Sequence, residues 1–231
     1  MKYITRIWHR ILRYVGITPT RKFNPSHPPH GMSIGEGYCI FGTPRYKIHK
    51  EAEVVLGKGV VLNSEPQGYH AGMSFPVTLL ADRPGASIMI GDESRLHGCC
   101  IHAWSQISIG RKCLLAAGSQ VLDSHGHATE LEFTRLRTNL QDMPEPIQIG
   151  DFCWLGLGAL VFKGAKIGEG CIVAAYSVVL KGDYPPFSLL AGSPAKIIRT
   201  LPETAILPED APLDSLTLDG KKIYQYQQRF S

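Results

Sequence analysis

The sequence contains no run of eighteen apolar residues, although hydrophobic residues make up 44% of its 231 positions. A membrane-spanning helix is therefore not expected. No signal-peptide pattern accompanies the six cysteines, which indicates the reducing cytoplasm and argues against a disulfide framework. Acidic residues are absent before Glu36, where six Lys or Arg occur, so the net charge of +4 divides into +6 there and −2 (4 − 6) in the remainder. The body therefore lacks the basic charge that favours nucleic-acid binding.

The N-terminal segment has the pattern of an amphipathic basic helix. Residues 3–15 place Ile4, Ile7, Trp8, Ile11 and Val15 at helical spacing, and arginines lie on the other sides. We expect this helix to pack its apolar face on the body or on a neighbouring subunit. The second interpretation is peripheral contact with the inner face of a membrane, to which each Lys or Arg would add about 1 kcal/mol. With the Pro-rich connector that follows, the helix makes up residues 1–33.

Six consecutive hexads make up the most regular stretch of the chain, from Ile149 to Tyr184. Each begins with an aliphatic residue, and its fifth residue is small in all but the last hexad. The leading residues are Ile149, Leu155, Val161, Ile167, Val173 and Val179. A period of six fits neither a helix of about 3.6 residues per turn nor a long strand, but it suits short strands joined by tight corners. Each hexad would form one side of a triangular coil, with the aliphatic residue inside and the next coil about 4.8 Å away.

Similar hexads begin at Ile34 and predict a coiled body over residues 34–184. The period is lost at 41–53 and at 63–79, which are expected to be loops. It returns at Ala86, with Ile90, Leu96 and His102 as the leading, inward residues of the hexads. The one extra residue between His102 and Ile109 would form a bulge at a corner. Four cysteines fall at the small corner position, which favours packing over metal binding. These cysteines are Cys100, Cys113, Cys153 and Cys171.

The period breaks between Val121 and Ile149, which are 28 residues apart where six would continue the coil. The excess of 22 residues (28 − 6) must leave the prism, and we expect an excursion loop over residues 123–147. The loop opens with the motif DSHGH at 123–127. Loops that project from a rigid scaffold commonly carry the chemistry.

Two prolines at 185 and 186 follow the last hexad, so residues 185–231 are expected to form a C-terminal extension. Within it, Asp219-Gly220 separates two β-prone runs and predicts a hairpin. The sequence thus predicts three parts, with the coiled body in the middle.

Four stretches together resemble one family: the hexads, DSHGH, IGDFCWLG at 149–156 and AGSPAKIIR at 191–199. They resemble the hexapeptide-repeat acyltransferases over about residues 86–201. Within that family, ADRPGASIMIG at 81–91 is most similar to the O-acetyltransferases of bacterial surface polysaccharides. The resemblance implies an all-β fold, a left-handed parallel β-helix. It also implies a cytoplasmic homotrimer that binds acetyl-coenzyme A (acetyl-CoA) between two neighbouring prisms and transfers the acetyl group directly to a sugar hydroxyl.

The family motif Gly-His matches Gly126 and His127, which makes His127 the first candidate for the general base and His125 the second. A sugar hydroxyl is a poor nucleophile at neutral pH, and an imidazole that titrates near that pH can remove its proton. Asp123 is a candidate to hold the imidazole tautomer, although a backbone carbonyl would serve equally. By the same resemblance, the backbone N–H of Leu157 would stabilise the oxyanion.

Other positions that match the family would bind acetyl-CoA, and no metal is expected. Trp154 would lie beside the donor groove, and cationic side chains would face the nucleotide phosphates. The small residues along the pantetheine are Gly156, Gly158, Ala174 and Ala175. The cations are Lys181, Lys196 and Arg199. Each has a structural alternative, since Trp154 could cover a coil face, the glycines could serve only the corners, and the lysines could be solvated surface.

The acceptor is less defined by the sequence than the donor. Relatives acetylate amino-sugar nitrogens on the same scaffold, so an N-acetyltransferase is the alternative. Acceptor contacts are expected from the loop at 63–75 and from charged residues of the excursion. The latter are Glu130, Glu132, Arg135 and Arg137.

Two readings from other classes remain. His97 and His102 have the spacing of the zinc pair in γ-class carbonic anhydrases, which share the prism fold, with His70 as a third ligand. The second alternative is a non-catalytic trimeric scaffold protein. The excursion and Trp154 favour the transferase over both.

Overall fold

The computed structural model describes residues 28–212, 217–218 and 221–222. The predicted N-terminal helix, and with it the membrane contact, lies outside the described residues. The chain divides into two compact units, residues 1–200 and residues 201–231. The first unit contains the coiled body and every residue predicted for the site.

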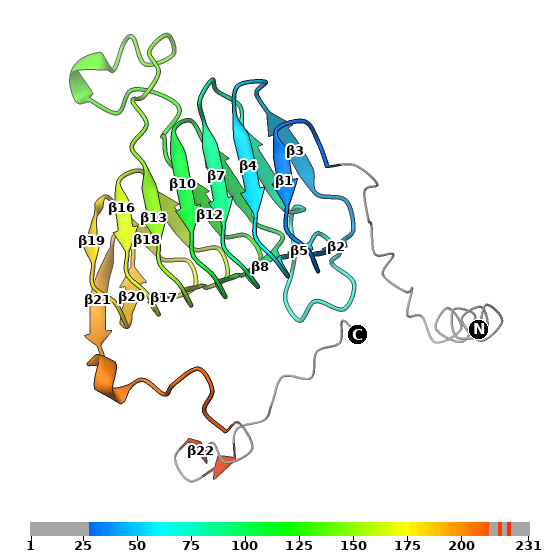
Figure 1. Cartoon of the computed structure of the whole chain (residues 1–231). Coiled ribbons are helices and arrows are strands. Elements are labelled where there is room, and N and C mark those ends of the chain that lie inside the picture. Colours follow the sequence, from blue (N-terminus) through cyan, green and yellow to red (C-terminus); the bar gives the residue numbers. More distant parts are fainter. Residues whose placement is uncertain (1–27, 213–216, 219–220, 223–231) are drawn as a thin grey trace, which may run out of the picture. The chain divides into compact units, whose positions relative to one another are not determined.

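Three sheets form the sides of a triangular prism, and the chain passes from the first sheet to the second and then to the third in each coil (Figure 1). The first sheet contains β1 (Met32–Ile34), β4 (Glu53–Leu56), β7 (Ser87–Ile90), β10 (Gln106–Ile109), β13 (Ile147–Ile149), β16 (Ala165–Ile167) and β19 (Gly182–Tyr184). The second contains β2 (Cys39–Phe41), β5 (Val61–Asn63), β8 (Arg95–His97), β11 (Leu114–Leu115), β14 (Trp154–Leu155), β17 (Ile172–Val173), β20 (Ser188–Gly192) and β21 (Ala195–Thr200). The third contains β3 (Arg45–Ile48), β6 (Thr78–Ala81), β9 (Cys100–Ala103), β12 (Gln120–Leu122), β15 (Leu160–Phe162) and β18 (Val178–Val179).

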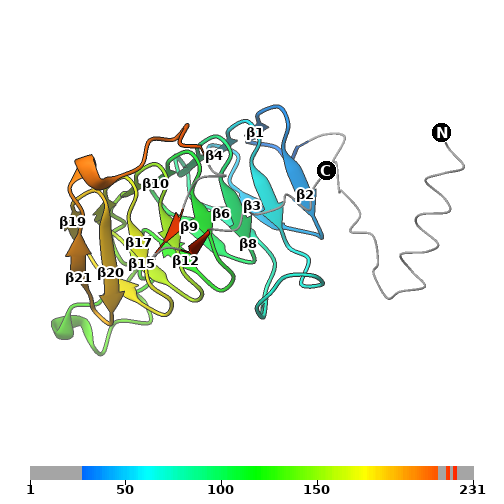
Figure 2. The ribbon, with the colours of Figure 1, turned by 90° about the horizontal axis from the view of Figure 1, so that it is seen from below.

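Equivalent strands of successive coils pair in parallel, which makes the body a parallel β-helix (Figure 2). The strand β21 is different, because it runs antiparallel to β20 at the end of the second sheet. We call the edge between the first and second sheets the first corner, that between the second and third sheets the second corner, and that between the third and first sheets the third corner.

The leading residues of the hexads point into the prism, as predicted. Leu155, Val161, Val173 and Val179 are completely buried, and Ile149 and Ile167 are nearly so. The register places Leu115 beside Leu155 and Leu155 beside Val173. Each coil therefore buries the apolar side chain of the next, and the coils stabilise one another through nearest-neighbour contacts.

The coil is longer than the hexads indicate. Residues 41–53, expected to be a loop, contain β3, which pairs with β6 through Arg45 and Thr78. This stretch lacks hexad glycines, but its backbone hydrogen bonds with the next coil hold it in the third sheet. At the other end, β19 and β20 continue the coil across the two prolines at 185 and 186, and β20 pairs in parallel with β17.

The third coil contains Ile101 in the core where the hexads place His102. Leu96 lies beside Leu115 and Cys100 beside Gln120, so the second corner is one residue shorter here (100 − 96 = 4 against 120 − 115 = 5). Ile101 is completely buried, whereas His102 is partly exposed on the outer face. The prediction of an inward His102 was therefore wrong by one residue.

Three of the predicted corner cysteines pack as expected. Cys113, Cys153 and Cys171 lie side by side at the first corner, and each thiol donates to a backbone carbonyl of the next coil. Cys100 is different, because it lies within β9 and is half-buried. All six cysteines are free.

Two loops leave the body at different corners (Figure 1). Residues 64–77 leave the second corner between β5 and β6. The excursion leaves the third corner between β12 and β13 and includes the short helix η1 (Leu131–Phe133). In the second unit, η2 (Glu203–Ala205) precedes β22 (Thr217–Leu218) and β23 (Lys221–Lys222), which pair antiparallel where a hairpin is predicted, with Asp219 and Gly220 outside the described residues.

Candidate functional site

Equivalent residues of successive coils lie side by side along the second corner. The registers of β11, β14 and β17 place Ala117 beside Leu157 and Leu157 beside Ala175. Backbone hydrogen bonds connect these coils, from the Gly158 N–H to the Ala117 carbonyl (3.0 Å) and from the Tyr176 N–H to the Leu157 carbonyl (2.8 Å). The second corner is therefore a line of backbone groups that advances about 4.8 Å per coil.

A β-turn over residues 156–159 fixes the backbone at Leu157. The Ala159 N–H donates to the Gly156 carbonyl (3.1 Å), and Gly158 has a φ of +63°. A positive φ at the third residue is the mark of a type II turn and favours glycine there. The Leu157 N–H has no hydrogen-bond partner among the described residues. It is thus able to donate to a negative charge that develops beside this corner.

The small residues of the corner are required by the packing of the coils. A Cβ at Gly156 would lie 2.7 Å from the Ala175 nitrogen, and one at Gly158 would lie 2.5 Å from the ring of Tyr176. Ala174 is half-buried, with its N–H bonded to the next coil, and Ala175 is exposed. Contacts between coils alone explain both glycines, whereas the exposed backbone at Ala175 is accessible to a ligand.

Trp154 points away from the core on the second sheet. It pairs with Leu114 on one side and Ile172 on the other, and the exposed fractions of the three residues are 46%, 36% and 40%. These residues form a row, which we call the apolar row, that runs from coil to coil parallel to the second corner. Contiguous exposed apolar surface of this kind commonly marks a binding face.

Two of the three predicted cations lie beyond the apolar row. Arg199 on β21 pairs with Leu189 of β20, which in turn pairs with Ile172 of the row. Lys196 pairs with Ala191, and both cations are exposed. Lys181 instead lies at the third corner, where it forms an ion pair with Glu145. The structure therefore places Lys196 near the second corner and Arg199 at the end of the apolar row, whereas Lys181 lies at neither.

His127 is exposed on the excursion, and a backbone carbonyl orients its ring. Its Nδ1 lies 3.1 Å from the Arg137 carbonyl oxygen. Because that oxygen can only accept, the contact assigns the hydrogen to Nδ1 and leaves Nε2 of the neutral imidazole as a base. The Arg137 side chain donates to the carbonyls of Ala128 (2.8 Å) and Glu130 (3.2 Å). Arg137, expected among the acceptor contacts, is thus bonded within the excursion.

His125 lies at the base of the same loop, and its ring packs on Phe162 with 4.9 Å between centroids. Its backbone N–H donates to the buried carboxylate of Asp142 (2.8 Å), which also accepts from the Lys163 ammonium. Burial acts to raise the pKa of Asp142, but the bonds from Lys163 and His125 outweigh it and lower that pKa below its ordinary value. The pair therefore fixes the loop backbone next to the DSHGH motif.

Asp123 serves the coil and has no hydrogen bond to a histidine among the described residues. Its carboxylate accepts from the backbone N–H groups of Trp104 and Ser105, both at 2.7 Å. The side chain is completely buried, and burial raises its pKa. The bonds from Trp104 and Ser105 act to lower that pKa, but burial prevails. The tautomer of His127 is held by the Arg137 carbonyl, which is the alternative that the sequence left open.

The two halves of the predicted site lie at different corners of one chain. The excursion with His127 leaves the third corner, whereas Leu157 lies at the second. The side of the prism between them runs from Gly158 to Lys163, five steps along the chain (163 − 158) or about 16 Å at about 3.3 Å per step. Groups that must meet around one reacting carbon lie within about 3 Å of it, so one chain places these two apart.

The histidines proposed as zinc ligands have other partners and lie on different sheets. His97 on β8 contacts Asn63, whereas His102 on β9 contacts Asp82 (3.0 Å) and accepts from the Trp104 indole (3.0 Å). The described residues contain no group of three or more His, Cys, Asp or Glu side chains that could hold a metal ion. No helix in the described ranges is long and apolar enough to cross a membrane.

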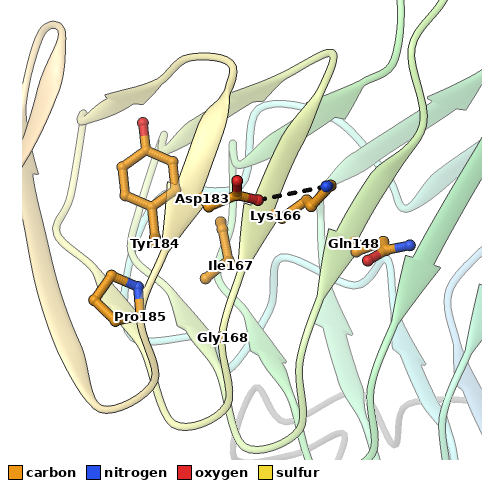
Figure 3. A pocket seen from close by; sticks show the side chains of 7 residues that line it. All are labelled: Gln148, Lys166, Ile167, Gly168, Asp183, Tyr184 and Pro185. Carbon is orange, nitrogen blue, oxygen red and sulfur yellow. Dashed lines mark ion pairs between the residues drawn. The ribbon is translucent and has the colours of Figure 1, made fainter.

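A shallow depression lies on the first sheet, away from the second corner with Leu157 and from the third corner, where the excursion leaves the body (Figure 3). Lys166 of β16 and Asp183 of β19 form an exposed ion pair (3.5 Å) along its floor, and Gln148, Tyr184 and Pro185 surround them. None of the predicted site residues lines it. We assign it no part in the chemistry.

Two residues that organise the site, Asp142 and Lys163, were not predicted from the sequence, and a third, Tyr69, lies in the loop at 63–75 that was expected to contact the acceptor. Asp142 and Lys163 hold the excursion, and Tyr69 covers the second corner, where its hydroxyl accepts from the Ala117 N–H (3.3 Å). Their partners are 21 and 48 positions away in the sequence. Since neither contact repeats with the hexads, no local pattern indicated it.

Residues 146–181 match the family model described as the hexapeptide repeat of succinyl-transferase. A protein of Mycobacterium tuberculosis, named a "probable acetyltransferase", is 24% identical over 85% of this chain and 57% of its own length. One of Schizosaccharomyces pombe, named a "putative acetyltransferase", is 38% identical over 41% of this chain and 44% of its own. The chain thus spans about half the length of these relatives.

A solved structure supports the fold. AntD, an N-acyltransferase from Bacillus cereus solved with dTDP and 3-hydroxybutyryl-CoA, aligns with a TM-score of 0.53 over 74% of this chain and 84% of its own, at 13% identity. At this identity the likeness concerns the fold only. Together with the repeat match and the names of the relatives, it confirms the resemblance predicted from the hexads, that of this chain to the hexapeptide-repeat acyltransferase family.

Proposed function

We propose that the protein is an acetyl-CoA-dependent O-acetyltransferase that acts in the cytoplasm on a sugar hydroxyl of a polysaccharide or of its precursor. The observation that carries the proposal is the contact of His127 Nδ1 with the Arg137 carbonyl, because it leaves Nε2 as a base on an exposed loop. The names of the relatives support the acetyl transfer. We further propose that the β-helix is left-handed, as the resemblance to the family implies.

The chemistry follows from these groups. His127 Nε2 removes the proton of the acceptor hydroxyl as the hydroxyl oxygen bonds to the thioester carbon. The Leu157 N–H donates to the oxyanion that forms. When the carbon–sulfur bond breaks, the thiolate of coenzyme A takes the proton from the imidazole, which restores the neutral base. Trp154 and Ile172 would cover the apolar part of the donor, and Lys196 and Arg199 would bind its phosphates.

We also propose that one site is built from two copies of the chain in a homotrimer. His127 and Leu157 lie at different corners of one prism, so the excursion of one copy would meet the second corner of its neighbour. A heterologous contact of this kind closes into a ring, for which three copies are the expectation from the family. The exposed apolar row is surface that such a contact and the donor would cover.

The test measures release of the coenzyme A thiol from acetyl-CoA with a panel of sugars as acceptors. His127→Ala should lower kcat by about 10² to 10⁴, the usual worth of a general base, with little change in the KM for acetyl-CoA. His125→Ala should cost about tenfold, because its ring packs on Phe162 and only its backbone is held by Asp142. Full activity of both variants would contradict the mechanism. Selective transfer to glucosamine would identify the amino-sugar N-acetyltransferase instead.

A further inference from the structure

The loop at residues 64–77 leaves the second corner between β5 and β6 (Figure 1), and its Tyr69 contacts the two following coils. The Tyr69 ring stacks on His97 with 5.1 Å between centroids and 22° between planes. Its hydroxyl accepts from the Ala117 N–H, and Ala117 is the neighbour of Leu157 in the preceding coil. A Cβ at Gly98 would lie 2.8 Å from the Phe75 carbonyl oxygen, so the loop fits closely on the corner. The Tyr69 hydroxyl thus bonds the corner one coil, about 4.8 Å, before Leu157, and its ring lies over the coil before that.

The two directions along the second corner differ. From Leu157 toward the C-terminus lie the exposed Ala175 and then β21 with Lys196, where the proposed donor has its pantetheine and phosphates. Toward the N-terminus the corner is closed by Tyr69. Because the donor occupies one direction, an acceptor that reaches the thioester carbon has to approach from the other.

Two histidine rings contact Tyr69 on that side. The ring of His70, which is exposed, lies 4.8 Å from that of Tyr69. His97 behind Tyr69 is nearly buried, and Asn63 donates to its Nδ1 (3.3 Å). The amide is oriented by its oxygen, which accepts from the Glu65 N–H (2.9 Å), so Nδ1 is unprotonated. Burial, with Arg95 and His70 nearby, lowers the pKa of His97 from 6.5 to about 4, which agrees with a neutral ring.

We propose that Tyr69 and His70 form the acceptor-binding wall of the site and that the wall takes an uncharged sugar ring. The inference rests on the proposed transferase function and goes beyond it by assigning the acceptor contacts to Tyr69 and His70 and by naming an uncharged acceptor. An aromatic face covers the apolar C–H face of a pyranose, and a polar group at its edge bonds a hydroxyl. Neither Tyr69 nor His70 carries the carboxylate that an amine acceptor would favour, and the Glu65 carboxylate of the same loop accepts from the Gln67 N–H (3.4 Å).

The experiment measures thiol release from acetyl-CoA by the full chain with five probes: glucose, maltose, N-acetylglucosamine, glucosamine and glucuronic acid. The uncharged sugars should raise the rate above that of hydrolysis by water. For the best of them, Tyr69→Ala should raise the acceptor KM by about ten- to a hundredfold, the effect of losing a buried aromatic contact. The KM for acetyl-CoA and the rate of hydrolysis should stay within about twofold, because the donor lies in the other direction.

Three further variants complete the experiment. His70→Ala should also raise the acceptor KM, whereas Gln67→Ala, an exposed position of the same loop, should not. Tyr69→Phe keeps the ring and should retain the wild-type acceptor KM within about threefold. An unchanged acceptor KM in both Tyr69→Ala and His70→Ala would overturn the assignment, as would acceleration by the charged probes alone or by none. Failure of the proposed function is distinct, since His127→Ala would then leave thiol release intact.

Discussion

Replacing Leu157 by proline would remove one N–H from the second corner without changing the backbone geometry of the turn. Leu157 is the second residue of the turn 156–159, where proline is favoured in type II turns. Its N–H has no partner among the described residues, so no hydrogen bond within that part of the chain is lost. The fold should therefore tolerate the substitution, unlike most introductions of proline.

The expected effect is on the chemistry. Removal of one oxyanion donor typically lowers kcat by about 10² to 10³, or about 2.7 to 4 kcal/mol of transition-state stabilisation. Thiol release at saturating acetyl-CoA and acceptor measures this, and a thermal unfolding curve checks that the melting temperature stays within about 2 °C. Leu157→Ala, which retains the N–H, separates the loss of the donor from the loss of the side chain. A Leu157→Pro protein that folds and retains its kcat would refute the assignment.

Three other predictions concern stability and the N-terminus. The folded state favours the neutral form of His97, so protonation of this ring opposes folding. The free energy of unfolding should therefore fall by about 3 kcal/mol as the pH falls from 6.5 through about 4. Urea unfolding of His97→Asn should not show this decrease. Lys163→Met leaves the Asp142 carboxylate, whose side chain is 2% exposed, without its cation, so the free energy of unfolding should fall by about 3–5 kcal/mol. The control Lys166→Met, in an exposed pair with Asp183, should lower it by less than about 1 kcal/mol. If residues 1–18 contact membranes, their deletion should abolish co-sedimentation with anionic vesicles while transfer to a soluble acceptor survives; vesicle binding by the shortened chain would exclude this segment as the anchor.

The hexads predict most of the fold because their physical cause is local. An aliphatic residue every six positions fills the prism, and the corner glycines avoid contacts of 2.5–2.7 Å with the next coil. Where the causes are not local, two predictions from the sequence were wrong. The strand β3 carries no hexad signature, because its place is fixed by hydrogen bonds with β6. A single residue missing at the second corner shifted the expected inward position from Ile101 to His102.

The candidate site shows the same division. The glycines and Leu157 follow the period, and the structure places them along one corner. The interior of the excursion has no period, so the bonds of Arg137 could not be read from spacing. Lys181 was grouped with the other cations by its place in a motif, but its partner, Glu145, is 36 positions away across the third corner. Contacts across a corner between distant residues are set by the coil geometry alone.

The central claim is that one site uses His127 of one copy and Leu157 of another, and mixed oligomers test it most directly. His127→Ala and Leu157→Pro chains, each with little activity alone, would be co-expressed in equal amounts and the thiol-release rate measured per site. If each site takes its loop and its corner from different chains, about a quarter of the sites combine an intact loop with an intact corner, and about a quarter of the wild-type rate should return. If both groups come from one chain, every chain carries a lesion, and a mixture no more active than the separate variants would contradict the shared site.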